Sequence, residues 1–201
     1  ESRVNNKETL IKEIDNVNPT HIISFIGRTH GKIEDKVYST IDYLENDGKL
    51  VENIKDNLFA PLLLAFLCKE KSIHYTYLGT GCIFKYDDEQ QHPFGKEING
   101  FTETSKPNFF GSSYSVVKGF TDRLMHMFED NVLNLRIRMP ITDFENPRNF
   151  ITKITTYKYI CSIPNSMTVL PEMLPIVLDM MIKFKVGTIN LTNPGLISHN
   201  E

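Results

Sequence analysis

A tyrosine and a lysine four residues apart form a candidate proton-transfer pair in this sequence. Tyr114 and Lys118 lie in the run NFFGSSYSVVKGF, just after a Gly-Ser-Ser turn, and residues Ser113 to Glu129 have the pattern of a helix. Residues four apart on a helix are neighbours, so the phenol and the ammonium would point into the same space. A free tyrosine has a pKa of about 10, and a neighbouring ammonium lowers that pKa because it stabilises the phenolate.

A hydroxyl group at the end of the preceding strand extends this pair. The run IHYTYLGTG, from Ile73 to Gly81, has the pattern of a strand buried on both faces, and Thr80 lies at its end. Thr80 could polarise a substrate carbonyl while Tyr114 protonates the carbonyl oxygen, and Lys118 could bind the ribose of a nicotinamide cofactor. These residue types make a reductase half-site. The Tyr-x-x-x-Lys spacing by itself also fits an exposed helical pair with no function.

The composition limits the classes of function. The chain has 201 residues, of which 40% are hydrophobic and 23% charged, and its net charge is −3. These values predict one globular domain with a small appended lobe, and they give no basic footprint for nucleic acid. The longest apolar run, Leu58 to Cys68, is too short for a membrane span. Three cysteines without Cys-x-x-Cys spacing favour a reducing, cytoplasmic compartment, and six scattered histidines predict no metal site.

Strand-like and helix-like segments alternate along the chain. The expected helices are Asn5–Val17, Lys49–Lys71 with an interruption at Pro61, Ser113–Glu129, Asn149–Tyr157 and Pro171–Lys185. The expected strands are Thr20–Gly27, Ile73–Gly81, Val132–Ile141 and Gly187–Thr192, and a polar loop fills Tyr86–Asn108. This alternation predicts an α/β fold with a parallel sheet covered by helices on both faces.

Three segments with polar or glycine residues follow expected strands. They are Gly27 to His30, Gly79 to Cys82, and Met139 with Pro140. Ligands of open parallel sheets bind beyond the carboxyl ends of the strands. We therefore expect the three segments to meet at one crevice.

Several runs of the sequence resemble a known enzyme family. Thr80, Tyr114 and Lys118 resemble the catalytic set of the extended short-chain dehydrogenase/reductases that act on nucleotide sugars, and Asn57 in IKDNLFAP resembles the asparagine of that family's proton relay. The runs GTGCIF, PNFFGSSYS, LRIRMPI, NPRNFITKIT, IPNSMTVLPEMLPI and NLTNPGLISHNE resemble the bifunctional 3,5-epimerase/4-reductases that complete UDP-rhamnose synthesis. The resemblance covers nearly the whole chain.

This resemblance implies a fold, a reaction and partners. The fold would be a Rossmann-like doubly wound parallel sheet with a small C-terminal substrate lobe. The substrate would be UDP-4-keto-6-deoxy-D-glucose, which is epimerised at C3 and C5 and then reduced at C4 to UDP-L-rhamnose by NADPH, with NADH as the alternative cofactor. The resemblance also implies a homodimer formed through the two long helices, Lys49–Lys71 and Ser113–Glu129.

The resemblance also assigns roles to individual residues. Cys82 is the expected acid/base of the epimerisation, because GDP-fucose synthase, a sister enzyme, has a cysteine at the matching place, and Lys153 is its expected partner across the sugar. In an extended segment, Cys82 and Thr80 would face the same way. With Thr80, Tyr114 and Lys118 these make the catalytic set. The expected cofactor-binding residues are Gly27, Arg28, Asn57, Tyr114, Lys118, Pro140 and Ile141. The expected substrate-binding residues are His30, Thr80, Asn149, Asn165 and Thr168.

One departure from the family pattern concerns the cofactor pyrophosphate. The family begins with a Gly-x-x-Gly-x-x-Gly turn that binds this group, and these residues contain no such turn. We therefore expect that a βαβ unit is missing at the N-terminus and a helix at the C-terminus. The expected domains are an incomplete Rossmann-like domain at 1–141 and an incomplete lobe at 142–201, mainly for substrate.

Two other functions remain open at the level of sequence. One is a regulatory module of the same fold without catalysis, which the missing glycine turn favours. The other is a plain 4-keto-sugar reductase that lacks epimerase activity.

Overall fold

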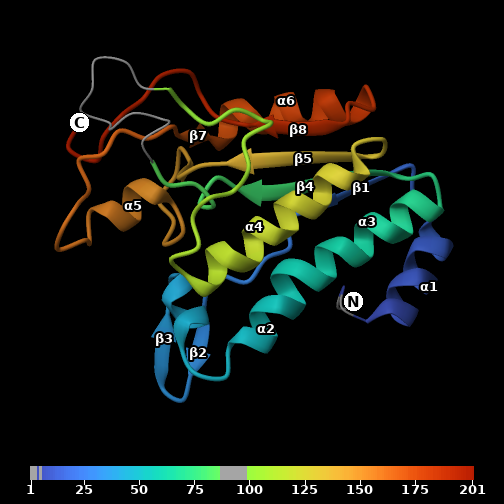
Figure 1. The fold of residues 1–201 in the computed structure, drawn as a ribbon, viewed down its shortest axis with the longest axis horizontal. Helices are drawn as coiled ribbons and strands as arrows, with labels where there is room; N and C mark the ends of the chain where they lie inside the picture. Colours follow the sequence, from blue (N-terminus) through green and yellow to red (C-terminus); the bar gives the residue numbers. More distant parts are fainter. Residues whose placement is uncertain (1–3, 5, 87–98) are drawn as a thin grey trace.

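A four-stranded parallel sheet forms the centre of the protein (Figure 1). The computed structural model describes residue 4, residues 6–86 and residues 99–201. The strands are β1 (His21–Ser24), β4 (His74–Thr80), β5 (Val132–Ile137) and β8 (Gly187–Asn190), in the order β1-β4-β5-β8. The register pairs His21 with His74, Tyr75 with Val132, and Leu133 with Gly187. The predicted parallel sheet is confirmed.

Helices cover both faces of this sheet, as predicted (Figure 1). On one face, α1 (Lys7–Val17), α3 (Ala60–Glu70) and the end of α4 (Ser113–Met125) pack against Tyr75 and Tyr77 of β4. On the other face, α6 (Leu170–Ile182) packs against Leu133 and Leu135 of β5. Successive side chains of a strand point to opposite faces, so an apolar strand such as β5 supplies both layers of the core.

The long helix predicted over Lys49–Lys71 has an interruption, but its form differs from the prediction. It consists of α2 (Leu50–Ile54), the π-helical turn η2 (Lys55–Phe59) and α3, which has Pro61 in its first turn. Proline is tolerated in a first turn, where its missing N–H group is not needed. The change of winding therefore precedes Pro61 and places Asn57 in the π-helical turn.

Two predicted strands end earlier than expected. β1 stops at Ser24, and β5 stops at Ile137 because Met139 has a φ angle of 43°, which no strand continues through. Pro140 and Ile141 form β6 (Pro140–Ile141), which pairs in parallel with β7 (Thr168–Val169) in a separate small sheet.

The region between β1 and α2 contains elements that the sequence did not predict. β2 (Gly31–Ile33) and β3 (Lys36–Tyr38) form an antiparallel hairpin, followed by the 3₁₀ helix η1 (Ile41–Glu45). Gly31 begins β2 where the ring of Tyr43 lies against the backbone, and a Cβ atom at Gly31 would be 2.4 Å from that ring. The hairpin and η1 together lie beside the start of α4 (Figure 1).

The remaining elements are short. They are the 3₁₀ turn η3 (His126–Phe128) after α4 and the helix α5 (Phe150–Ile154), which is shorter than the predicted Asn149–Tyr157. Residues 87–98 of the predicted polar loop lie outside the described residues. In the described part of the chain, no helix has the length and apolar character needed to cross a membrane.

The division at residue 141 remains a prediction. Within the segment 142–201, α5 and the residues around it lie apart from the sheet, whereas α6 and β8 return to it. The second segment therefore contributes one strand and one covering helix to the central unit.

Candidate active site

The three predicted segments lie at the same edge of the sheet. β1, β4 and β5 are parallel and end at Ser24, Thr80 and Ile137, so the residues that follow them leave the sheet on one side. Two of the segments contact residues of the helices. A Cβ atom at Gly27 would lie 3.1 Å from Oδ1 of Asn57 and 3.9 Å from Nζ of Lys118. The backbone carbonyl of Cys82 accepts a hydrogen bond of 2.8 Å from Ser115 of α4.

The N-terminus of α4 is fixed by two oxygen-bearing side chains. Ser112 is the N-cap and accepts a hydrogen bond of 3.1 Å from the N–H of Ser115. The carboxylate of Glu45, from η1, accepts hydrogen bonds from the N–H groups of Ser113 at 3.0 Å and Tyr114 at 3.3 Å. A carboxylate at this end of a helix satisfies free N–H groups and interacts favourably with the helix dipole. The first turn of α4, and with it Tyr114, is therefore held in place.

Tyr114 and Lys118 are both buried, which excludes the exposed helical pair. Tyr114 is 7% exposed and hydrogen-bonds with the side chain of Thr80. Lys118 is 5% exposed, and its ammonium contacts the hydroxyl of Tyr77 and lies 4.7 Å from the centre of the Tyr77 ring. Burying a lysine is costly, so its presence here requires a reason beyond solubility.

The electrostatics of the pair differ from the expectation. Burial lowers the pKa of Lys118 to about 8, although electrostatic interactions with Asp122 and Cys82 act in the opposite direction. Burial raises the pKa of Tyr114, and only the hydrogen bond from Thr80 lowers it. The predicted lowering of the Tyr114 pKa by Lys118 is therefore not found in the structure, where the ammonium contacts the hydroxyl of Tyr77. Tyr114 is a protonated phenol, which suits a proton donor.

The side chain of Asn57 binds the backbone of the segment that follows β1. Its Oδ1 accepts from the N–H of Arg28 at 2.9 Å, and its Nδ2 donates to the Arg28 carbonyl at 2.9 Å and to Asn53 at 2.8 Å. The carbonyl of Asn57 accepts from the hydroxyl of Thr121 at 2.6 Å. Arg28 in turn forms an ion pair with Asp56 at 2.8 Å. The side chain of Asn57 thus positions the expected cofactor loop, while direct contact with a cofactor stays a prediction.

Cys82 lies in a turn rather than in an extended segment. Its N–H donates to the hydroxyl of Thr80 at 3.0 Å, and β4 has already ended at that threonine. The sulfur of Cys82 accepts a hydrogen bond of 2.8 Å from Nη1 of Arg138. Nε and Nη2 of Arg138 donate to Oδ1 of Asn165 at 3.0 and 2.8 Å. Arg138 therefore joins two residues that the sequence predicted for the site.

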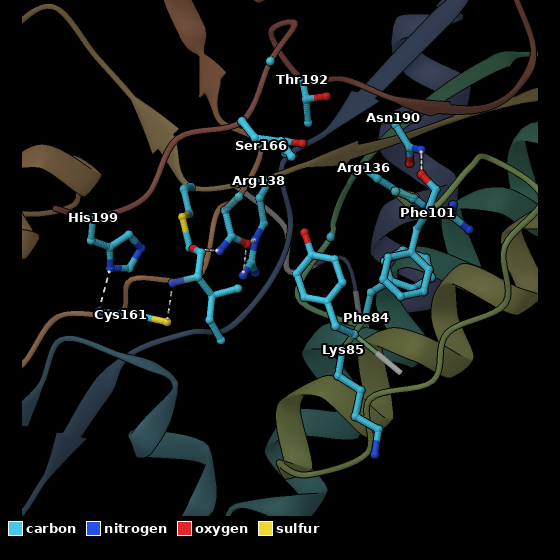
Figure 2. Close-up of a pocket in the computed structure, with 18 residues that line it drawn as sticks. Phe84, Lys85, Phe101, Arg136, Arg138, Cys161, Ser166, Asn190, Thr192 and His199 are labelled. Carbon is cyan, nitrogen blue, oxygen red and sulfur yellow. Dashed lines mark hydrogen bonds between the residues drawn. The ribbon is translucent and has the colours of Figure 1, made fainter. Parts of the chain in front are cut away.

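A cavity of about 790 Å³ opens beside this group (Figure 2). Arg138 lies between Cys161 and His199 on one side and the stacked rings of Phe84 and Phe101 on the other, whose centres are 4.5 Å apart. Asn165 and Gly81 also line the cavity, which thus extends to the residue before Cys82.

A second group of basic residues lies where α5 approaches the loop after β1. Arg148 donates a hydrogen bond of 2.7 Å to Nε2 of His30, which must therefore accept as a neutral ring. Burial, and then the charge of Arg148, lowers the pKa of His30. Lys153 of α5 is half-buried, and burial together with Arg148 lowers its pKa as well. The structure thus brings His30 and Lys153 into one electrostatic group.

Other predicted substrate residues have structural contacts. Asn149 is the N-cap of α5, and its amide also bonds the backbone of Thr142 and Phe144. The hydroxyl of Thr168 accepts from the N–H of Arg138 at 3.0 Å and donates to the carbonyl of Leu191 at 2.7 Å. Thr168 is fully buried and holds β7 next to the end of β5. Substrate contact by these residues stays a prediction.

Comparison with known proteins identifies the family. No protein-family model matches the chain. A protein of Acanthamoeba polyphaga mimivirus is 61% identical over 201 residues, which are 100% of this chain and 67% of that protein. The crystal structure of the UDP-rhamnose synthase of the same virus has a TM-score of 0.92 and 60% identity, and it covers 100% of this chain and 67% of that chain. The chain belongs to the UDP-rhamnose synthase family.

Other relatives agree with the assignment of this chain to the UDP-rhamnose synthase family. The bifunctional dTDP-4-dehydrorhamnose 3,5-epimerase/dTDP-4-dehydrorhamnose reductase of Arabidopsis thaliana is 42% identical over 200 residues, which are 99% of this chain and 62% of that enzyme. The structure of dTDP-4-dehydrorhamnose reductase from Bacillus anthracis in complex with NADP has a TM-score of 0.73 at 14% identity, covers 98% of this chain and 65% of that chain, and shows the same fold. The chain thus spans about two thirds of the length of these proteins.

Sequence reasoning missed two arginines of this UDP-rhamnose synthase family member. Arg136 and Arg138 both line the cavity, and both belong to the run LRIRMPI. Arg136 is 1% exposed, forms a two-pronged ion pair with Asp122 of α4 at 2.8 Å, and donates to the carbonyls of Thr102 and Ser105. An arginine inside an apolar strand is rarely buried without a partner, and this was the available signal.

Proposed function

We propose that the protein converts UDP-4-keto-6-deoxy-D-glucose to UDP-L-rhamnose with NADPH, by epimerisation at C3 and C5 followed by reduction at C4. One observation carries this proposal. The half-buried Thr80 and Cys82 lie at the sheet edge with the buried Tyr114 and Lys118, in a chain 60% identical to a UDP-rhamnose synthase of known structure. A regulatory module would not need to bury a lysine and a tyrosine together.

The first half of the reaction requires an acid and a base. The 4-keto group makes the protons at C3 and C5 acidic, and the resulting enolate carries its charge on the ketone oxygen. Cys82 as a thiolate accepts each proton, and Lys153 returns one to the opposite face. The lowered pKa of Lys153 supports this role because proton transfer is most efficient when the pKa is near the working pH. Thr80 and Tyr114 hydrogen-bond to the ketone oxygen and stabilise the enolate.

The second half uses the same hydroxyl groups. NADPH, when bound, supplies the hydride to C4. Tyr114 donates its proton to the C4 oxygen, and its raised pKa keeps that proton available at neutral pH. Thr80 holds the C4 oxygen in position with its own hydroxyl, which interacts with the hydroxyl of Tyr114. One pocket serves both halves because each half needs the same oxygen polarised.

The residues beside β1 and β5 fit a nicotinamide cofactor. A Cβ atom at Gly27 would lie 3.1 Å from Oδ1 of Asn57 and 3.9 Å from Nζ of Lys118, so a side chain at this position would crowd both groups. Glycine is favoured where a ligand approaches the backbone closely. We propose that Gly27, Arg28, Tyr114 and Lys118 hold the ribose side of the cofactor, with Pro140 and Ile141 at the nicotinamide. A reductase of the same fold holds NADP, which agrees with NADPH as the proposed cofactor.

Two expectations about the whole protein belong to this proposal. The homodimer is supported by four exposed apolar side chains on the outer faces of the long helices, at spacings of seven residues: Phe59, Phe66, Phe120 and Met127. The cytoplasmic location rests on the cysteine content of the sequence.

The experiment uses the full-length protein, UDP-4-keto-6-deoxy-D-glucose and NADPH. The loss of absorbance of the reduced cofactor gives the rate, and NMR identifies the sugar formed. UDP-L-rhamnose is the expected product. An unepimerised 6-deoxy sugar would leave a plain reductase, and a folded protein that oxidises no NADPH would point to the regulatory module.

Cys82→Ala separates the two halves of the reaction. This variant is expected to form no UDP-L-rhamnose from the unepimerised ketone, while it still reduces UDP-4-keto-L-rhamnose supplied directly. Cys161→Ala is the matched control, because Cys161 is an exposed cysteine whose sulfur accepts a hydrogen bond from the N–H of Ile163.

A further inference from the structure

Three free cysteines in this chain have different surroundings. Cys68 is buried, and burial raises the pKa of its thiol to about 12. Cys161 is exposed. Cys82 is half-buried, and its sulfur accepts a hydrogen bond from Nη1 of Arg138 at 2.8 Å. Lys118 and Tyr114 also interact electrostatically with Cys82.

The guanidinium of Arg138 is held rigidly. Nε and Nη2 converge on Oδ1 of Asn165, which fixes the plane of the group, and the N–H of Arg138 donates to Thr168, which is buried. Met139, the next residue, has a φ angle of 43°, which turns the chain out of the sheet immediately after Arg138. These contacts determine where Nη1 points.

The backbone of Cys82 is held equally well. Its N–H donates to Thr80, and its carbonyl accepts from Ser115. The sulfur therefore has little freedom except rotation about one bond, and the hydrogen bond from Arg138 selects the rotamer. Charged donors next to a cysteine favour the thiolate, which is the form that accepts a proton.

We propose that Arg138 is a positioning residue for the epimerisation, which holds Cys82 as a thiolate where its side chain packs against the cluster of Tyr43, Leu44 and Tyr114. This inference rests on the proposed function. In the step that it supports, the sulfur takes the proton from C3 or C5 and an S–H bond forms. The electron pair of the broken C–H bond becomes part of the enolate, and Lys153 gives a proton to the opposite face. The thiol and the neutral amine then exchange the proton through water.

The first test measures thiolate reactivity and needs no substrate. Full-length wild type, Arg138→Met and Arg138→Lys are treated with iodoacetamide at neutral pH, and alkylation is followed for each cysteine by mass spectrometry of peptides. Cys161 is the internal reference for access and reagent. We expect Arg138→Met to lower the ratio of Cys82 to Cys161 alkylation by about tenfold or more, and Arg138→Lys to lower it by less, because lysine keeps the charge but lacks the planar fork. An unchanged ratio in Arg138→Met overturns the proposal.

The second test separates a role in epimerisation from general binding. Exchange of deuterium from solvent into C3 and C5 is measured with oxidised NADP, and reduction is measured with UDP-4-keto-L-rhamnose. Arg138→Met is expected to lower exchange by about tenfold more than it lowers reduction. Equal losses in both would make Arg138 a substrate-binding residue and overturn the positioning role. Circular dichroism establishes that each variant is folded.

The outcomes distinguish this inference from the proposed function. If wild type shows no exchange at C3 and C5, the proposed function fails, and the alkylation ratio still decides whether Arg138 controls Cys82. If wild type exchanges both protons and Arg138→Met does so equally fast, the proposed function stands and the role of Arg138 fails.

Discussion

The ammonium of Lys118 is buried. Its burial lowers the stability of the fold, and we infer that the residue is kept for its function. Its ordinary pKa of 10.5 falls to about 8 in the folded protein, mainly because burial disfavours the charged form. This lowering of the pKa corresponds to a loss of about 3 kcal/mol in the free energy of unfolding while the ammonium stays charged. A residue that lowers the stability of the fold by this amount is typical of active sites, where a perturbed pKa serves the reaction.

Lys118→Met is therefore expected to stabilise the cofactor-free protein. At pH 7 its free energy of unfolding, measured with urea, should exceed that of wild type by about 1–3 kcal/mol, because methionine fills the space without a buried charge. Reduction of the ketone should be lost. Lys12→Met, at an exposed lysine of α1, is the control and should change neither property. A less stable Lys118→Met would mean that the contacts with Tyr77 and Asp122 outweigh desolvation.

The gain from Lys118→Met should depend on pH. Between about pH 8 and pH 10.5 the unfolded wild-type chain binds a proton at this lysine that the folded protein has released, so wild-type stability from this group rises with pH. The difference between variant and wild type is thus largest below pH 8 and disappears as the pH approaches 10.5. Urea unfolding of both proteins over pH 7–10 measures this trend, and a constant difference would contradict the pKa change.

Tyr114→Phe tests the proton donor separately. Removal of the Tyr114 hydroxyl should lower the rate of reduction by about 10²–10⁴-fold, which is the usual contribution of a positioned acid. Binding of NADPH, measured by fluorescence, should change little. Tyr38→Phe is the control, because it removes a hydroxyl that bonds Asn46 from a tyrosine packed on the same cluster as Tyr114. A variant that keeps most of its reduction rate would remove Tyr114 from the mechanism.

At the scale of elements, the π-helical turn η2 links the helix layer to the loop after β1. Asn57 lies in this turn, is fully buried, and bonds both the N–H and the carbonyl of Arg28. Since no other described side chain bonds both of these backbone groups, the position of the proposed cofactor loop depends on one amide.

Asn57→Ala should therefore weaken cofactor binding as well as stability. We expect a loss of about 2–4 kcal/mol in the free energy of unfolding, because two buried backbone groups lose their partners. The KM for NADPH should rise more than kcat falls. Asn6→Ala is the matched control, because it removes the N-cap of α1 and lowers stability by about 1 kcal/mol without touching the loop. Equal effects of the two variants on the KM would contradict this role.

The sheet and its covering helices could be predicted from the sequence because their signals are local. Buried strands such as β4 are apolar runs, and α1 ends at Asn18 before a proline, with φ 45° at the asparagine. The hairpin β2–β3 gave no such signal. Its turn residue Glu34 has φ 52° without being the glycine or asparagine that usually marks a hairpin turn.

The candidate site was only partly predictable for a different reason. Tyr114, Lys118 and Thr80 are found by spacing and by resemblance. The contact between Arg138 and Cys82 joins residues 56 positions apart, and nothing local to either one indicates it. The π-helical winding of η2 likewise accompanies long-range bonds of Asn57, to Arg28 and from Thr121.

At the scale of the whole molecule, the outer faces of α3 and α4 predict the assembly. Phe66 of α3 and Phe120 of α4 are each more than half exposed. We expect the wild type to be a dimer in size-exclusion chromatography with light scattering, and the double variant Phe66→Asp/Phe120→Asp to be a monomer, because charges disfavour an apolar interface. Phe144→Asp, at an exposed phenylalanine outside these helices, is the control and should stay dimeric. A dimeric double variant would place the interface elsewhere.

The small sheet of β6 and β7 has a consequence for how this protein can evolve. The chain leaves the core through Pro140 and Ile141 and returns through Thr168 and Val169, and these two ends pair directly with each other. The excursion between them includes α5 with Lys153, as well as Asn165, and the parallel pair of β6 and β7 closes it at its base. Such a segment can be exchanged between relatives as a single cassette, because its junctions meet at one place and the sheet below need not change. New sugar preferences could therefore arise by recombination of this cassette alone.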